Sequence, residues 1–139
     1  MARTDYNLSG LPFVVDPHNT PRDNGHQIDW ANVADTYKNT AGKKVLPAGV
    51  AVGSLLGGGK VSPRVALTNP AIGFLATAAV EGESFAAATG YGLFLGGVFF
   101  ENLLPDATGT PKTLASAIKT ELNASGTGVA FRTYTDTRG

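Results

Sequence analysis

Residues 45–67 read VLPAGVAVGSLLGGGKVSPRVAL, and this stretch holds the strongest fold signal of the chain. Residues 45–56 are mostly apolar and are interrupted by a turn sequence, Pro47-Ala48-Gly49. Three glycines follow at 57–59, and apolar residues then alternate along 60–67, as in a strand with one buried face. The stretch therefore predicts a β-hairpin that turns at the glycines.

Further apolar segments follow this hairpin. Residues 71–80 predict a short strand that ends at Glu81-Gly82-Glu83. Residues 91–100 predict an aromatic strand with a bulge or close backbone approach at Gly96-Gly97. Because 45–100 carries so little charge, we expect the core to come mainly from this stretch; its charged residues are Lys60, Arg64, Glu81 and Glu83.

The C-terminal part predicts one helix and a final strand. Thr110 can cap the helix, Pro111 suits its first position, and Gly126 or Gly128 would end it. Apolar side chains at a spacing of four form one stripe, namely Leu114, Ile118 and Leu122. Alternation returns along 129–135. The sum is a β-rich α+β domain of short strands with one C-terminal helix.

The N-terminal residues differ from the rest in composition. Residues 1–25 are broken by proline, glycine and a turn signal, with one apolar patch at 11–15, so they predict an extended arm. The folded domain is expected over 26–139. Residues 28–38 fit a helical spacing and, at their start, an alternating one, and we favour extended structure. Removing residues 1–15 is expected to leave the domain folded.

Composition excludes several classes of function. The 139 residues contain 11 Lys+Arg and 11 Asp+Glu, so the net charge of +0 provides no field that would gather nucleic acid or an anionic membrane. No apolar run is long enough to span a bilayer, and the first twenty residues lack the apolar core of a signal peptide. The chain has no cysteine, which excludes disulfides and thiolate metal sites. We therefore expect a soluble protein without nucleic-acid or membrane partners.

No catalytic, metal or cofactor site is predicted. His18 and His26 lie in or beside the arm, and their spacing to neighbouring aspartates matches no metal motif. The sequence around 57–60 lacks the first glycine and the final Ser or Thr of a phosphate loop. Glu101 follows an apolar strand, and a structural hydrogen bond is its expected role. We expect that the chain is not an enzyme.

Three segments carry a resemblance to a known family. They are Leu-Pro-Ala-Gly at 46–49, Gly-Phe-Leu-Ala-Thr-Ala-Ala at 73–79, and Gly-Val-Phe-Phe-Glu-Asn-Leu-Leu-Pro-Asp-Ala at 97–107. In this order, followed by a helix and a strand, they resemble the head decoration (capsid cement) proteins of tailed bacteriophages, the family of the phage lambda decoration protein. The likeness covers about two thirds of the chain, from residue 45 onward.

The resemblance implies a structural role on a virion. Such proteins bind the outer surface of the expanded capsid as a homotrimer and stabilise the lattice of the major capsid protein, and their N-terminal arm becomes ordered there. We expect contact with the capsid or a neighbouring subunit through Leu11, Phe13, Val14, Val15 and Trp30. The alternative is a small β-rich carbohydrate- or surface-binding module with a concave site lined by aromatic residues such as Trp30, Tyr37 or Tyr91.

Overall fold

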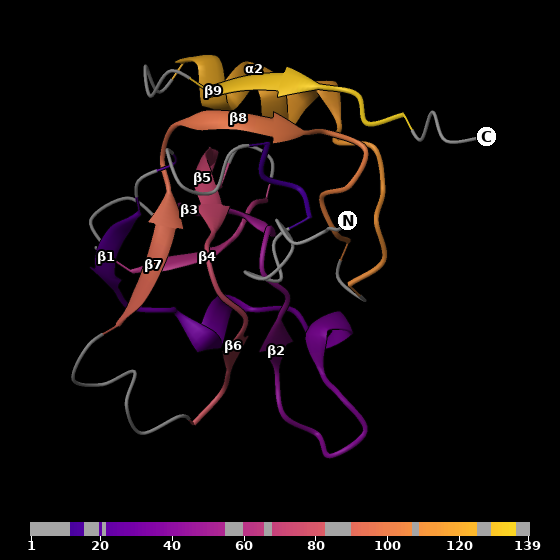
Figure 1. Ribbon diagram of the computed structural model, residues 1–139. Helices are drawn as coiled ribbons and strands as arrows, with labels where there is room; N and C mark the ends of the chain where they lie inside the picture. Colours follow the sequence, from indigo (N-terminus) through magenta and orange to yellow (C-terminus); the bar gives the residue numbers. More distant parts are fainter. Residues whose placement is uncertain are drawn as a thin grey trace.

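The computed structural model describes residues 12–15, 20, 22–54, 60–65, 68–82, 90–106, 109–124 and 129–135 (Figure 1). In these ranges the chain forms nine strands and one α-helix, which confirms the β-rich α+β class with a C-terminal helix. The elements are β1 (Asp23–His26), 3-10 turns at Trp30–Asn32 and Asp35–Tyr37, β2 (Val45–Leu46), β3 (Ala51–Ser54), β4 (Val61–Pro63), β5 (Ala71–Leu75), β6 (Ala79–Val80), β7 (Tyr91–Phe94), β8 (Gly97–Phe100), α2 (Ser116–Ala124) and β9 (Val129–Arg132).

The main sheet has five antiparallel strands in the order β1-β7-β5-β3-β4. Its two edges are joined by the residues that follow β1. Asp29 N–H donates to the carbonyl of Val61 in β4 at 2.8 Å, and Val61 N–H donates to the carbonyl of Gln27 at 2.9 Å. The residues after β1 therefore reach the opposite edge of the sheet, and the edge strand β4 gains a backbone partner at Val61.

Side chains on the two faces of this sheet enter two different cores. Leu75 and Leu93 belong to an inner cluster, together with Val52 and Tyr91. Their sequence neighbours Phe74 and Phe94 point to the other face and enter an outer cluster. This alternation follows from the two-residue period of a strand.

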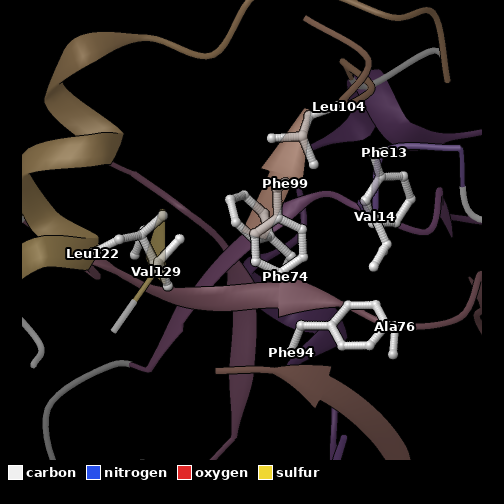
Figure 2. Close-up of a cluster of buried hydrophobic side chains, with 10 residues drawn as sticks. Phe13, Val14, Phe74, Ala76, Phe94, Phe99, Leu104, Leu122 and Val129 are labelled. Carbon is white, nitrogen blue, oxygen red and sulfur yellow. The ribbon is translucent and has the colours of Figure 1, made fainter. Parts of the chain in front are cut away.

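A second layer covers the outer cluster. Strands β8 and β9 pair in parallel, residues 13–15 pair with β8 in antiparallel fashion, and α2 packs against β5. Figure 1 shows β8, β9 and α2 together at one end of the molecule. In Figure 2 the rings of Phe74 and Phe99 lie between Leu122 and Val129 on one side and Phe13 and Val14 on the other.

The predicted hairpin is confirmed by the antiparallel pairing of β3 with β4, and a turn separates β2 from β3 at Ala48-Gly49. Its glycine turn, 57–59, lies outside the described residues. The second strand is shorter than predicted: β4 ends at Pro63, and Val65 is 51% exposed.

Two predicted strands are each divided in the structure. Residues 71–80 form β5 and β6, which belong to different sheets. Residues 91–100 form β7 and β8, so Gly96-Gly97 marks a change of sheet and not a bulge within one strand. Gly97 has φ of 120°, and a Cβ there would lie 2.8 Å from Thr20 Cγ2, so a side chain would be strained and crowded.

Three further predictions need correction. Residues 28–38 form two 3-10 turns, and β-pairing is limited to single bridges at the two ends, from Ile28 to Val61 and from Lys38 to Lys44. The helix begins at Ser116, because residues 110–114 instead pair with 101–106 through their backbone. Strand β1 crosses the predicted boundary at residue 25, so the sheet includes the last residues assigned to the arm.

Candidate functional site

A cavity of about 250 Å³ opens where the turn before β3 meets the loop between β8 and α2. Its wall combines short backbone segments with side chains that come from distant parts of the chain. The lining comprises Tyr37, Gly49, Val50, Ala51, Arg64, Leu104, Pro105, Asp106, Lys112, Thr113, Leu114, Ala115 and Ile118.

Gly49 is a part of this wall where the chain packs closely. Its N–H donates to the carbonyl of Leu75 at 2.7 Å, and its φ is 98°. A Cβ at Gly49 would lie 2.7 Å from Pro105 Cδ and 2.8 Å from Phe13 Cε2. Because a side chain would be both strained and too close to two rings, the junction requires glycine.

Arg64 and Glu121 form a charged pair that links the cavity to α2. Arg64 donates from Nε and Nη2 to the Glu121 carboxylate at 2.6 to 3.2 Å, and Ala71 N–H donates to the same carboxylate at 2.8 Å. Their side chains are only 18% and 19% exposed. The hydrogen bond from Arg64 lowers the pKa of Glu121 despite its partial burial.

Tyr37 and Asp106 lie at another side of the cavity. Burial, and then the negative charge of Asp106, raise the pKa of the Tyr37 phenol above its usual value. The phenol therefore stays protonated over the physiological pH range.

Residues 110–115 supply a backbone edge at the mouth of the cavity. Lys112 N–H donates to Leu104 at 2.9 Å and Leu114 N–H to Glu101 at 3.0 Å, while Thr110 accepts from Asp106 at 2.9 Å. This alternation is that of an extended strand, so the amide of Thr113 points the opposite way. Within the described ranges, no hydrogen bond links Thr113 to another residue. We call the N–H and carbonyl of Thr113 the free edge.

The expected contact residues do not form one surface. Leu11 lies outside the described residues, whereas Phe13 and Val14 are 2% and 5% exposed and pack inside the outer cluster. Val15 is half-buried beside β8, and Trp30 packs against the inner cluster instead. In this conformation Phe13 and Val14 are held by their own chain and offer no surface to a partner.

The aromatic residues of the alternative module are also separated. Tyr37 lines the cavity, Tyr91 is buried in the inner cluster, and Trp30 is not part of the lining. The structure therefore does not bring them together in one concave site.

Other singled-out polar residues have local partners. Glu101 accepts from Lys119 Nζ at 2.5 Å, a structural contact as predicted. His26 Nε2 lies 2.8 Å from an oxygen of Asp23, and His18 lies outside the described residues. The described ranges hold no group of three or more side chains suited to a metal ion, and none of their helices has the length and apolarity to cross a membrane.

No family model matches the chain. Comparison with curated proteins and with solved structures also gave no significant match.

Sequence reasoning missed most of the residues that shape the cavity. Arg64 is one of few charges in an apolar stretch, and a lone charge there indicates a partner, but nothing in the spacing points to Glu121. Thr113 was assigned to a helix, so its free edge was not foreseen. The sequence indicates the turn at Gly49 and, within the alternative concave site, Tyr37.

Proposed function

We propose that the protein is a capsid decoration protein of a tailed bacteriophage. It binds the outer surface of the expanded head as a homotrimer and stabilises the lattice of the major capsid protein. The resemblance in three sequence segments is the source of this proposal, and its expected contact through Phe13 and Val14 is no longer part of it.

The observation that carries the proposal is the way those three segments meet. Gly49, from the first segment, donates its N–H to Leu75 of the second and packs directly on Pro105 of the third. The three segments are separated in sequence, yet they meet at one junction around Gly49. Because separated short matches are individually weak, their convergence at one packed site supports a shared structural origin.

The physical basis of such a role is linkage. A protein that binds only the expanded lattice stabilises that state through its binding free energy, and many identical sites add their effects. No chemical step is required of the bound protein. The proposed activity is therefore a gain in shell stability.

The test is co-sedimentation with shells of the source phage. Purified protein is mixed with expanded, undecorated heads and, in parallel, with unexpanded heads, and the bound copies per major capsid subunit are counted. We expect saturable binding near one copy per subunit on expanded heads only. If the folded protein does not co-sediment with expanded heads, the proposed capsid function is refuted.

A further inference from the structure

We propose that the cavity is a peptide-binding site for an extended segment of a partner protein. One apolar side chain of that segment enters the cavity, and the backbone of the segment pairs with Thr113 on the free edge. This inference goes beyond the decoration function and does not rely on it. It rests on the size of the cavity, on the unpaired backbone beside it and on the charges at its mouth.

The size of the cavity selects the occupant. Pockets for small organic ligands usually measure roughly 300–1,000 Å³. At about 250 Å³ this cavity is below that range, but it is large enough for one aliphatic side chain. Apolar side chains line much of it, among them Leu104, Leu114 and Ile118.

The free edge supplies the second requirement. An extended peptide binds to a sheet edge through main-chain hydrogen bonds and gains specificity from pockets that receive alternate side chains. Thr113 is exposed, its N–H and carbonyl have no partner among the described residues, and it also lines the cavity. Backbone pairing at Thr113 would therefore place a neighbouring side chain of the peptide over the opening.

Two cations add further recognition. Arg64 donates from Nε and Nη2 to Glu121. Its Nη1 group forms no hydrogen bond with any residue that the structure describes, although the side chain is only 18% exposed. Those remaining donors suit a carbonyl oxygen of the peptide. Lys112 is exposed at the rim and forms no ion pair within the described ranges, so it favours an acidic residue of the peptide beside Lys112, whereas Asp106 disfavours one on its own side of the cavity.

The experiment uses the full chain, labelled with 15N, and amide chemical shifts as the readout. The probe is a capped pentapeptide with a central leucine, an adjacent aspartate and serine elsewhere. We expect saturable shifts at the amides of Gly49, Thr113 and Ala115. Replacing the aspartate of the probe by lysine should weaken binding about threefold, the scale of one exposed ion pair.

Variants separate backbone pairing from side-chain burial. Thr113→Pro removes the free N–H without breaking a described hydrogen bond, and it should weaken the probe about tenfold. Thr113→Ala keeps the N–H and is the matched control. If Thr113→Pro does not fold, Lys112→Glu gives an independent test, because it should reverse the preference between the aspartate and lysine probes.

Several results would overturn the inference. One is the absence of shifts at these amides at millimolar probe. A second is equal binding by 3-methylbutan-1-ol, which carries the branched apolar group of leucine without any peptide group, since the peptide backbone would then contribute nothing. A third is a concentration-dependent shift of the same amides without probe, which would identify a second copy of the chain as the occupant.

Discussion

Phe13 should contribute more to the free energy of unfolding than any other residue of the N-terminal segment that the structure describes. Its ring is 2% exposed and packs on Phe94 and Phe99, with centroids 6.4 and 6.5 Å apart. Its carbonyl also accepts from Phe100 N–H at 2.7 Å. Phe13→Ala keeps that backbone bond but removes the ring, and the loss of a buried phenyl costs about 3–5 kcal/mol.

The assay is urea unfolding followed by far-ultraviolet circular dichroism. With a slope of about 1.5 kcal/mol per molar urea, a loss of about 4 kcal/mol lowers the midpoint by roughly 2.7 M. Val65→Ala is the matched control, because Val65 is 51% exposed and its replacement should change stability by less than about 0.5 kcal/mol. A midpoint for Phe13→Ala within error of the Val65→Ala value would refute the placement of Phe13 in the core.

A double-mutant cycle tests the same contact from its other side. Gly49→Ala alone is expected to destabilise the domain. The Cβ of the alanine would lie 2.8 Å from the Phe13 ring, and the residue would have to adopt the positive φ of Gly49. In the Phe13→Ala background the ring is gone, so the second substitution should cost less. Contacting residues commonly show such coupling, at about 0.5–3 kcal/mol. Strict additivity would mean that Gly49 and Phe13 do not touch.

Three more predictions concern polar groups. Glu121→Gln should lower the free energy of unfolding at pH 7 by about 2 kcal/mol, measured by urea unfolding. The pKa of Glu121 is lowered in the folded state, so the stability advantage of the wild type is present above pH 4.5. This advantage disappears as the pH falls through the lowered pKa. Tyr37 should ionise above pH 10.0 in an absorbance titration at alkaline pH, and Asp106→Asn should bring its pKa down. Asn69→Leu should cost about 2–3 kcal/mol, because the buried amide accepts from Val65 N–H at 2.9 Å and donates to Ser62 Oγ at 2.9 Å.

The strands that depend on alternating apolar residues were predictable from the sequence. Val129 and Phe131 point towards the outer cluster while Ala130 and Arg132 are exposed, as the alternation along 129–135 requires. The pairing of β3 with β4 follows in the same way from the hairpin pattern. In these segments local sequence and tertiary burial favour the same conformation, so periodicity is sufficient.

Other elements form only because of tertiary partners. Asp23-Asn24-Gly25-His26 is a turn sequence with little strand propensity, yet β7 offers it an edge and it becomes β1, with Gly25 at φ 91° and an irregular register. Pro111 suits a helix start, but it bridges to Pro105 and the helix begins later. Backbone pairing with another segment outweighs these local preferences, and no pattern in the sequence records it.

The cavity could not be predicted for a related reason. Its wall is assembled from six separate segments, between Tyr37 and Ile118, and each contributes only one to four residues. A sequence pattern reports which face of an element is apolar, but not which elements leave space between them. The charged pair of Arg64 with Glu121 is likewise set by the packing of α2 on β5, and not by spacing along one element.

The burial of Phe13 also decides how the role of the N-terminal residues in capsid binding should be tested. Removing residues 1–15 would delete Phe13 and Val14 from the core and would destabilise the domain. A loss of capsid binding after that deletion would therefore have two explanations, an unstable domain or a lost contact with the capsid. The informative deletion stops at Leu11 and keeps every contact described for 13–15. We expect this shorter chain to retain the wild-type urea midpoint and to bind expanded heads more weakly in the co-sedimentation assay. Unchanged midpoint with unchanged binding would show that residues 1–11 make no contribution, and the contact with the shell would then have to come from the folded domain alone.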